Sequence, residues 1–210
     1  METKKIGIRV LIISGAAILV IEVAIRLFVF QNPMIILGVA RLLEIILMLL
    51  IVLSFGNGLF SIGLERSRLS HGFKRGLIWS AGFGVAATLA FTALYFIGIK
   101  ALPFIKANLP EKHTQIALFF FIGGVVAPIA EEIFFRGIVY GFFRRWGIVT
   151  AIVLSTLVFV LAHPKLGVPV IQTLGGIVFA ISYEVEGSLV VPMTIHASAN
   201  LAIFALSLGI

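Results

Sequence analysis

The chain has 210 residues, of which 60% are hydrophobic and only 12% charged, and its mean hydropathy is +1.18. Soluble domains are typically about half apolar and a quarter charged, so this composition indicates an integral membrane protein. The net charge of +7 comes from Lys and Arg residues between apolar runs, which form no basic patch for nucleic acid. The sequence has neither Cys nor Asp. This excludes disulfides, thiolate nucleophiles, the two-aspartate protease mechanism and a Ser-His-Asp triad.

Seven apolar stretches approach or exceed the roughly 17–25 residues that a membrane helix needs. They predict an all-α polytopic bundle with about seven transmembrane helices, built as one integral membrane domain over residues 1–210. Lys and Arg are more frequent on the side of the N-terminus, which predicts a cytoplasmic N-terminus. The first stretch is too long for a signal peptide and is interpreted as an uncleaved helix. In chain order the stretches are Ile6–Phe30, Met34–Phe55, Leu77–Ile99, Ile116–Phe143, Ile148–Ala162, Val168–Tyr183 and Leu189–Leu208.

Charged residues inside the first two stretches are spaced for local ion pairs. Glu22 and Arg26 stand at i,i+4, and Arg41 and Glu44 at i,i+3, so each pair lies on one helix face. Charges in the hydrocarbon region are costly and need a partner. We expect both pairs to neutralise themselves and to have no further function.

The fourth stretch contains "PIAEEIFFRG", which is harder to explain by local pairing. Glu132 and Arg136 form an i,i+4 pair in the favoured order, whereas Glu131 points about 100° away around the helix. Glu131 is therefore left without a local cation. We interpret it as a carboxylate that is available as a proton acceptor.

Two histidines and an asparagine stand in later stretches. His163 follows the fifth, while His196 and Asn200 share one face of the seventh at i,i+4. Polar side chains in membrane helices generally face the bundle interior, so we expect these groups to meet Glu131 in one pocket. A bend near Gly123 or Pro128 would bring Glu131 to the depth of His163. A Glu-His pair can activate water while neutral donors stabilise an oxyanion, which suits amide hydrolysis.

These residues resemble the CPBP intramembrane proteases, a family named for CAAX proteases and bacteriocin-processing enzymes and also called Abi. The family pattern has EExxxR on one helix, FxxxH on the next and HxxxN or HxxxD on a later one. The resemblance spans residues 116–200, and it places a protease core at about 116–208 with N-terminal helices over 6–99 before it. The matching motifs are Glu131-Glu132…Arg136, Phe159…His163 and His196…Asn200.

The resemblance implies a role for each motif residue. Glu131 would be the general base, assisted by His163, while His196 and Asn200 would polarise the scissile carbonyl and stabilise the oxyanion. Glu132 and Arg136 would hold the geometry of the site, and Phe159 would serve packing. The implied partners are the lipid bilayer and a peptide or protein substrate, lipidated or not.

The metal requirement stays open at this point. If a zinc ion is present, its ligands would be Glu131, His163 and His196. No HExxH motif provides a zinc cradle on one helix, and the amide of Asn200 is a poor zinc ligand. The sequence therefore favours metal-free, glutamate-dependent hydrolysis over a divalent metal cofactor.

Two other functions use similar residues. The first is a catalytically silent membrane binding or immunity protein with the same fold, and the second is a proton-coupled transporter, where Glu and His chains also occur. A rhomboid-like serine protease is excluded because no Gly-x-Ser-Gly site is present. Glu184 and Glu186, in the turn before the last stretch, are expected to be solvated.

Overall fold

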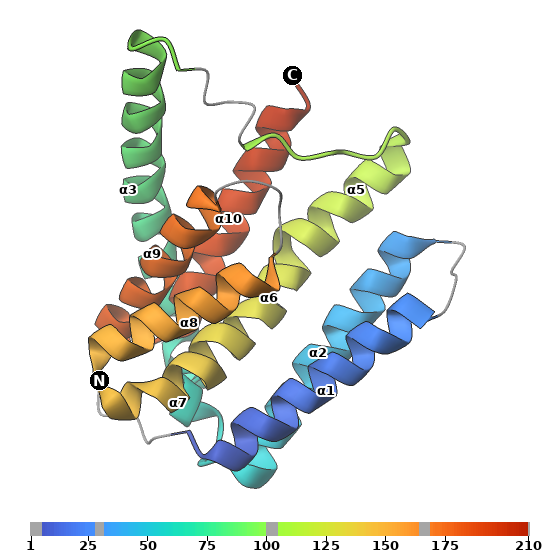
Figure 1. Ribbon diagram of the computed structural model, residues 1–210, viewed down its shortest axis with the longest axis vertical. Helices are drawn as coiled ribbons and strands as arrows, with labels where there is room; N and C mark the ends of the chain where they lie inside the picture. Colours follow the sequence, from blue (N-terminus) through green and yellow to red (C-terminus); the bar gives the residue numbers. More distant parts are fainter. Residues whose placement is uncertain (1–5, 28–31, 100–104, 164–168, 210) are drawn as a thin grey trace.

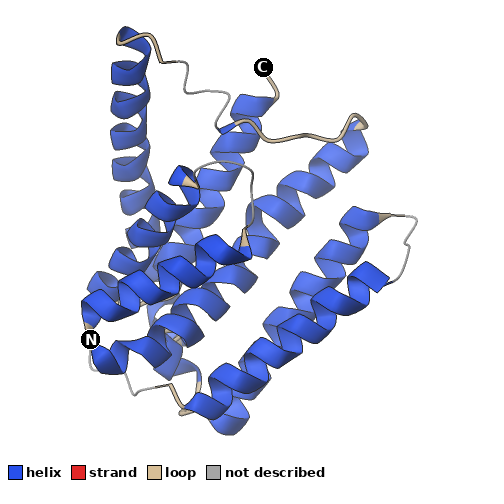
Figure 2. Ribbon diagram, viewed as in Figure 1, coloured by secondary structure: helices blue, strands red, loops and turns tan. Residues whose placement is uncertain are grey.

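Each of the seven expected stretches corresponds to a helix. The computed structural model describes residues 6–27, 32–99, 105–163 and 169–209. These residues are almost entirely helical and contain no strand (Figure 2). The all-α prediction is therefore confirmed, although the expected ends at Phe30 and Val168 lie outside the described residues.

The first three helices and the last three are regular. They are α1 (Ile8–Leu27), α2 (Pro33–Phe55), α3 (Leu69–Phe96), α8 (Ile148–Ala162), α9 (Val170–Glu186) and α10 (Val190–Ser207). Two 3-10 turns, Leu59–Ile62 and Arg66–Arg68, connect α2 to α3. The helix α3 begins at Leu69 rather than at the expected Leu77, because a helix continues through polar residues that a search for apolar runs leaves out.

The helix between α3 and α8 is continuous but irregular over His113–Trp146. It consists of α5 (His113–Phe121), a π-helical turn (Ile122–Val126), α6 (Ala127–Glu132), a second π-helical turn (Ile133–Tyr140), α7 (Gly141–Phe143) and a 3-10 turn (Arg144–Trp146). π-helical turns are rare and occur mostly at functional sites, often where a helix changes direction. The two turns here flank the Glu131-Glu132 pair.

This irregular helix lies in the middle of the bundle (Figure 1). It contacts α1 and α2 on one side and α8, α9 and α10 on the other, while α3 packs against α10. Membrane helices approach closely where residues are small. A Cβ on Gly76 of α3 would lie 2.5 Å from the Cβ of Thr194 in α10, and one on Gly176 of α9 would lie 2.8 Å from Cγ2 of Thr156 in α8. Because these two positions have no side chain, α3 lies close to α10 and α9 lies close to α8.

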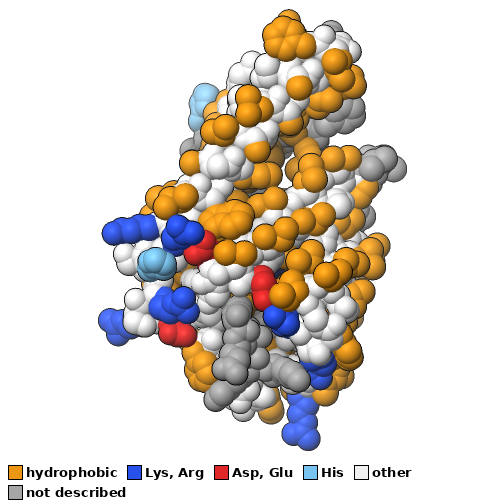
Figure 3. All heavy atoms as spheres, turned by 90° about the vertical axis from the view of Figure 1, so that its left-hand side faces the viewer, with side chains coloured by type: hydrophobic (Ala, Val, Ile, Leu, Met, Phe, Trp, Pro, Cys, Tyr) orange, Lys and Arg blue, Asp and Glu red, His pale blue; other side chains and the backbone are white. Residues whose placement is uncertain are grey.

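Five helices of the described chain are long and apolar enough to cross a membrane, and α8 is a shorter apolar helix. Figure 3 shows the outer face that this produces, with hydrophobic side chains over most of it and charged groups concentrated in one zone. Such a surface is suited to lipid. The protein is an integral membrane protein.

The end of α9 differs from the prediction. Glu184 and Glu186 are not simply solvated: Glu186 forms an ion pair with Arg75 of α3 at 2.7 Å, and Glu184 one with Arg144 at 2.8 Å. Hydrogen bonds from Arg75 hold the pKa of Glu186 below its ordinary value. Burial raises the pKa of Glu184, but hydrogen bonds from Arg144 and Tyr140 outweigh it and the net shift is downward. The two carboxylates therefore tie α9 to the helices on both sides of it.

Candidate active site

The two adjacent glutamates of α6 have different surroundings. The Glu132 side chain is fully buried, whereas 19% of the Glu131 side chain is exposed. Oε1 of Glu132 lies 3.2 Å from Nη1 of Arg136, so the expected i,i+4 ion pair is present, and it also lies 2.8 Å from Nδ1 of His196. Arg136 donates a further hydrogen bond to the carbonyl of Gly176 at 3.2 Å. Glu132 therefore links its own helix to α10, and Arg136 links it to α9.

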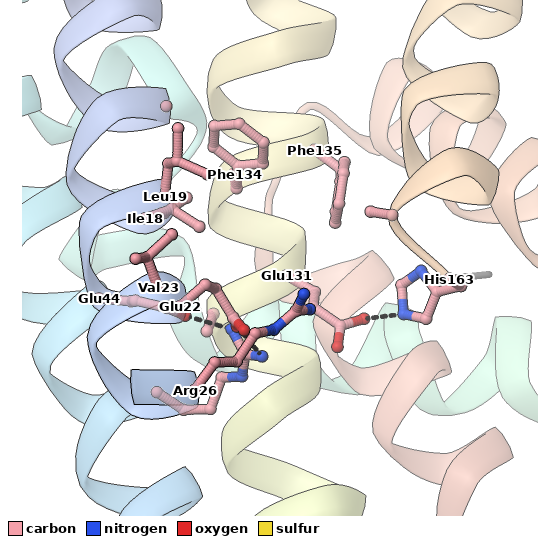
Figure 4. Close-up of a pocket in the computed structure, with 14 residues that line it drawn as sticks. Ile18, Leu19, Glu22, Val23, Arg26, Glu44, Glu131, Phe134, Phe135 and His163 are labelled. Atoms are coloured by element: carbon pink, nitrogen blue, oxygen red, sulfur yellow. Dashed lines mark hydrogen bonds and ion pairs between the residues drawn. The ribbon is translucent and has the colours of Figure 1, made fainter. Parts of the chain in front are cut away.

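His163 is held in one orientation by its own helix. Its Nδ1 lies 2.8 Å from the carbonyl oxygen of Phe159, and since a carbonyl only accepts, Nδ1 carries the hydrogen. In the neutral ring Nε2 then has a lone pair, and this atom lies 3.4 Å from Oε2 of Glu131 (Figure 4). His163 is thus oriented by the backbone and presents an acceptor to the carboxylate.

His196 approaches the same carboxylate from α10. Its Nδ1 is directed at Glu132, and its Nε2 lies 3.7 Å from Oε2 of Glu131. Oε2 of Glu131 is buried and makes no hydrogen bond within the described chain. Two imidazole nitrogens therefore converge on one carboxylate oxygen at distances that suit a shared proton and are too short for a water molecule between them. A water molecule bound beside these atoms would have proton acceptors in the Glu131 carboxylate and in Nε2 of the neutral His163 ring.

Aromatic rings enclose this polar centre. The ring of Phe179 stacks on His196 with centroids 4.6 Å apart, and Phe159 lies 4.5 Å from His163. The guanidinium of Arg136 lies over Phe159 at 4.6 Å, an arrangement in which the ring face attracts the cation. Phe159 has 3% exposure and serves packing, as expected. The rings pack against both imidazoles, of which His196 is nearly buried and His163 is 30% exposed on the side of the pocket.

Asn200 has a structural contact that the sequence analysis did not foresee. Its Nδ2 donates a hydrogen bond of 2.9 Å to the carbonyl of Gly123, in the first π-helical turn. No contact joins Asn200 to Glu131 within the described chain. One of its two amide hydrogens is therefore engaged, and the other is free for a ligand.

A pocket of about 540 Å³ opens beside this centre. Glu131 and His163 line it on one side, together with Phe134 and Phe135, while α1 and α2 form the opposite wall. Figure 4 shows Glu131 between the charged wall and His163. Sequence reasoning treated α1 and α2 only as helices that precede the core, and it missed their part in the pocket.

The charges of that wall are paired differently from the expectation. Arg41 of α2 binds Glu44 at 2.5 Å, as expected, but it also binds Glu22 of α1 at 2.6 Å. The expected pair of Glu22 with Arg26 is therefore wrong, because Glu22 has a partner on the neighbouring helix. Arg26 lines the pocket and makes no ion pair or hydrogen bond within the described chain.

A metal ion at this site would need ligands from Glu131, His163 and His196. Among the residues that the structure describes, no group of three or more His, Cys, Asp or Glu side chains is arranged to hold a metal ion. Both Nδ1 atoms are engaged, by Phe159 and by Glu132, which leaves one nitrogen of each imidazole. One nitrogen of each imidazole is enough for a metal ion, and the other nitrogen of a metal-bound histidine is commonly held by a carbonyl or a carboxylate. Glu131, His163 and His196 are therefore the side chains that would hold a metal ion, although their present arrangement is not a metal site.

Comparisons with known proteins agree with the motifs. Residues 113–202 match the family model described as type II CAAX prenyl endopeptidase, Rce1-like. No curated protein and no solved structure matches the chain. The match contains all the motif residues that line or support the site. Residues 113–202 are therefore similar to the CPBP family, in the form of its Rce1-like, type II CAAX prenyl endopeptidase model.

Proposed function

We propose that this protein is an intramembrane endopeptidase that hydrolyses a peptide bond near the C-terminus of a membrane-associated, CAAX-type substrate. The match of residues 113–202 to the Rce1-like family model supports a CAAX-type protease in general. The observation that carries the proposal is the convergence of His163 Nε2 and His196 Nε2 on Oε2 of Glu131, at 3.4 and 3.7 Å, beside a pocket. A carboxylate oxygen that is buried and makes no hydrogen bond, such as Oε2 of Glu131, is suited to take a proton from water.

In the proposed reaction a water molecule binds beside Glu131 and His163, on the side of the pocket. Glu131 accepts one proton while the hydroxyl oxygen attacks the carbonyl carbon of the scissile bond, and the carbonyl oxygen takes the negative charge. The accepted proton then passes to the leaving nitrogen as the C–N bond breaks. Water is consumed, and a carboxylate and an amine are released.

The developing negative charge needs donors that are already in place. Nδ1 of His196 faces the Glu132 carboxylate, which only accepts, so Nε2 can donate to the oxyanion when the ring carries both hydrogens. Asn200 stands one turn further on α10 and can use its second amide hydrogen. Glu132 and Arg136 act through His196 and α9 as positioning residues.

The test is a cleavage assay on the purified protein in lipid nanodiscs with a farnesylated peptide that has three aliphatic residues after the cysteine. The wild type should release the tripeptide, which mass spectrometry identifies by its new amino terminus. Glu131→Gln should abolish release. Glu111→Gln, which removes an exposed carboxylate outside the pocket, is the matched control and should cleave like the wild type.

The metal requirement is tested in the same assay. Preincubation with a chelator should leave the rate unchanged if Glu131 and His163 alone activate water. Loss of activity that zinc restores would instead establish a metalloprotease. If Glu131→Gln and wild type behave alike and no peptide is cleaved, the binding-protein interpretation replaces the protease.

A further inference from the structure

Arg26 is a cation without an ion pair among the residues that the structure describes, and it lies in the wall opposite the candidate base. It stands in the last turn of α1, is exposed, and lines the same pocket as Glu131 and His163. Figure 4 shows its side chain extending from α1 into the pocket, toward the side on which Glu131 lies. Within the described chain it has no ion pair and no hydrogen bond.

The neighbouring charges explain why Arg26 is unpaired. Its i,i+4 neighbour Glu22 is bound to Arg41 at 2.6 Å, and Arg41 also holds Glu44 at 2.5 Å. One guanidinium thus takes both carboxylates of the wall. No described acidic side chain of the wall remains to neutralise Arg26.

A guanidinium presents its N–H groups in a planar fork that matches a carboxylate, and such charge-assisted pairs are stronger than neutral hydrogen bonds. An unpaired charge in a membrane helix usually marks a site for a substrate or an ion. The pocket carries this cation on one wall and the candidate catalytic carboxylate on the other. It therefore suits a ligand with an anionic end and a reactive carbonyl.

We infer that Arg26 binds the free C-terminal carboxylate of the substrate and thereby sets the distance from the chain end at which the peptide is cut. This inference rests on the proposed function. A CAAX-type substrate ends three residues after its modified cysteine, which is about 10 Å of extended chain. A pocket of about 540 Å³ lies in the size range of small-ligand sites. Arg26 is a specificity residue, and Glu131 remains the base.

The experiment compares two farnesylated peptides of identical sequence, one ending in a free carboxylate and the other in an amide. We measure kcat/KM for both with wild-type protein, Arg26→Gln and Arg9→Gln in nanodiscs. Arg9 is the matched control, because it is an exposed arginine of α1 that does not line the pocket. The wild type should prefer the acid by about 10- to 100-fold.

Arg26→Gln should reduce the acid-to-amide ratio to about one, chiefly through KM, while Arg9→Gln should keep the wild-type ratio. Equal cleavage of acid and amide by the wild type would overturn the role of Arg26 and leave the protease intact. An equal loss for both peptides in Arg26→Gln would also overturn it, since a contact with lipid phosphate or a structural role affects both peptides alike. If the wild type cleaves neither peptide, the proposed function itself fails.

Discussion

This protein has two pairs of glutamates whose members are close in sequence, Glu131 with Glu132 and Glu184 with Glu186. The two pairs have opposite environments. At the end of α9, all four carboxylate oxygens of Glu184 and Glu186 have a donor, from Arg144, Tyr140, Arg75 or Trp79. On α6, Oε2 of Glu131 and Oε2 of Glu132 are both buried without a hydrogen bond within the described chain.

The difference separates carboxylates with both oxygens paired from carboxylates that keep one buried oxygen without a hydrogen bond. A fully paired carboxylate stabilises the fold and has little capacity left for a proton or a substrate. An underused buried oxygen is costly unless a ligand or water completes it, so it marks the place where chemistry is expected. Three substitutions and one change of pH test this difference between the two pairs.

The largest effect is expected from Glu131→Gln. Removing a general base lowers kcat by about 10²- to 10⁴-fold. The melting temperature should stay near that of the wild type, because Oε2 of Glu131 makes no hydrogen bond in the described chain. Steady-state kinetics and thermal unfolding in detergent measure both quantities, and a variant that keeps a tenth of the wild-type rate would show that another group accepts the proton.

Glu132→Gln should act mainly on stability. It leaves the buried Arg136 without its counter-charge, and breaking a buried ion pair in this way costs about 3–5 kcal/mol. Denaturant titration in micelles measures the unfolding free energy. Glu184→Gln is the control at the α9 pair, and a loss for Glu132→Gln no greater than for this control would contradict the comparison.

Asn200→Leu tests whether the amide completes the site around Glu131. Loss of one oxyanion donor lowers kcat by about 10²- to 10³-fold with little change in KM. The same substitution removes the hydrogen bond to Gly123, so the unfolding temperature is measured in parallel. A fall in stability with an unchanged kcat would limit Asn200 to holding the π-helical turn.

The smallest effect is expected from acid pH on the α9 pair. The folded-state pKa values of Glu184 and Glu186 are lowered, so their contribution is present above the ordinary carboxyl pKa and is lost as pH falls through the folded values. Partly exposed pairs of this kind contribute about 1 kcal/mol or less. Melting temperatures measured between neutral and acid pH should fall less steeply for Glu186→Gln than for the wild type.

The sequence was sufficient to predict where the helices lie and how Glu132 and Arg136 pair. The length of apolar runs located seven helices, and i,i+4 spacing correctly paired Glu132 with Arg136. Both features depend on one helix at a time, so periodicity and composition can predict them. The approach of His163 and His196 to Glu131 also follows the expectation that polar groups face the interior.

What the sequence could not provide is the choice of partner between helices. Spacing along one helix suggested Glu22 with Arg26, yet Arg41 of the next helix takes Glu22. Glu184 and Glu186 were expected in water because no cation is near them in sequence, and their partners Arg144 and Arg75 come from other elements. The hydrogen bond from Asn200 to Gly123 joins α10 to a π-helical turn at a position where the sequence predicted only a bend.

The π-helical turn Ile122–Val126 also determines where the central helix can change in length. A π turn contains one residue more than the α turn that can replace it. Deletion of one residue there would convert the π turn into an α turn. The helices on either side would keep the same faces toward their neighbours. Loss of one residue from Ala127–Glu132 would instead rotate the two helix parts by about 100° relative to each other and turn Glu131 away from His163. The central helix can therefore lose one residue just before α6 without turning Glu131 away from His163, whereas it cannot lose one within α6.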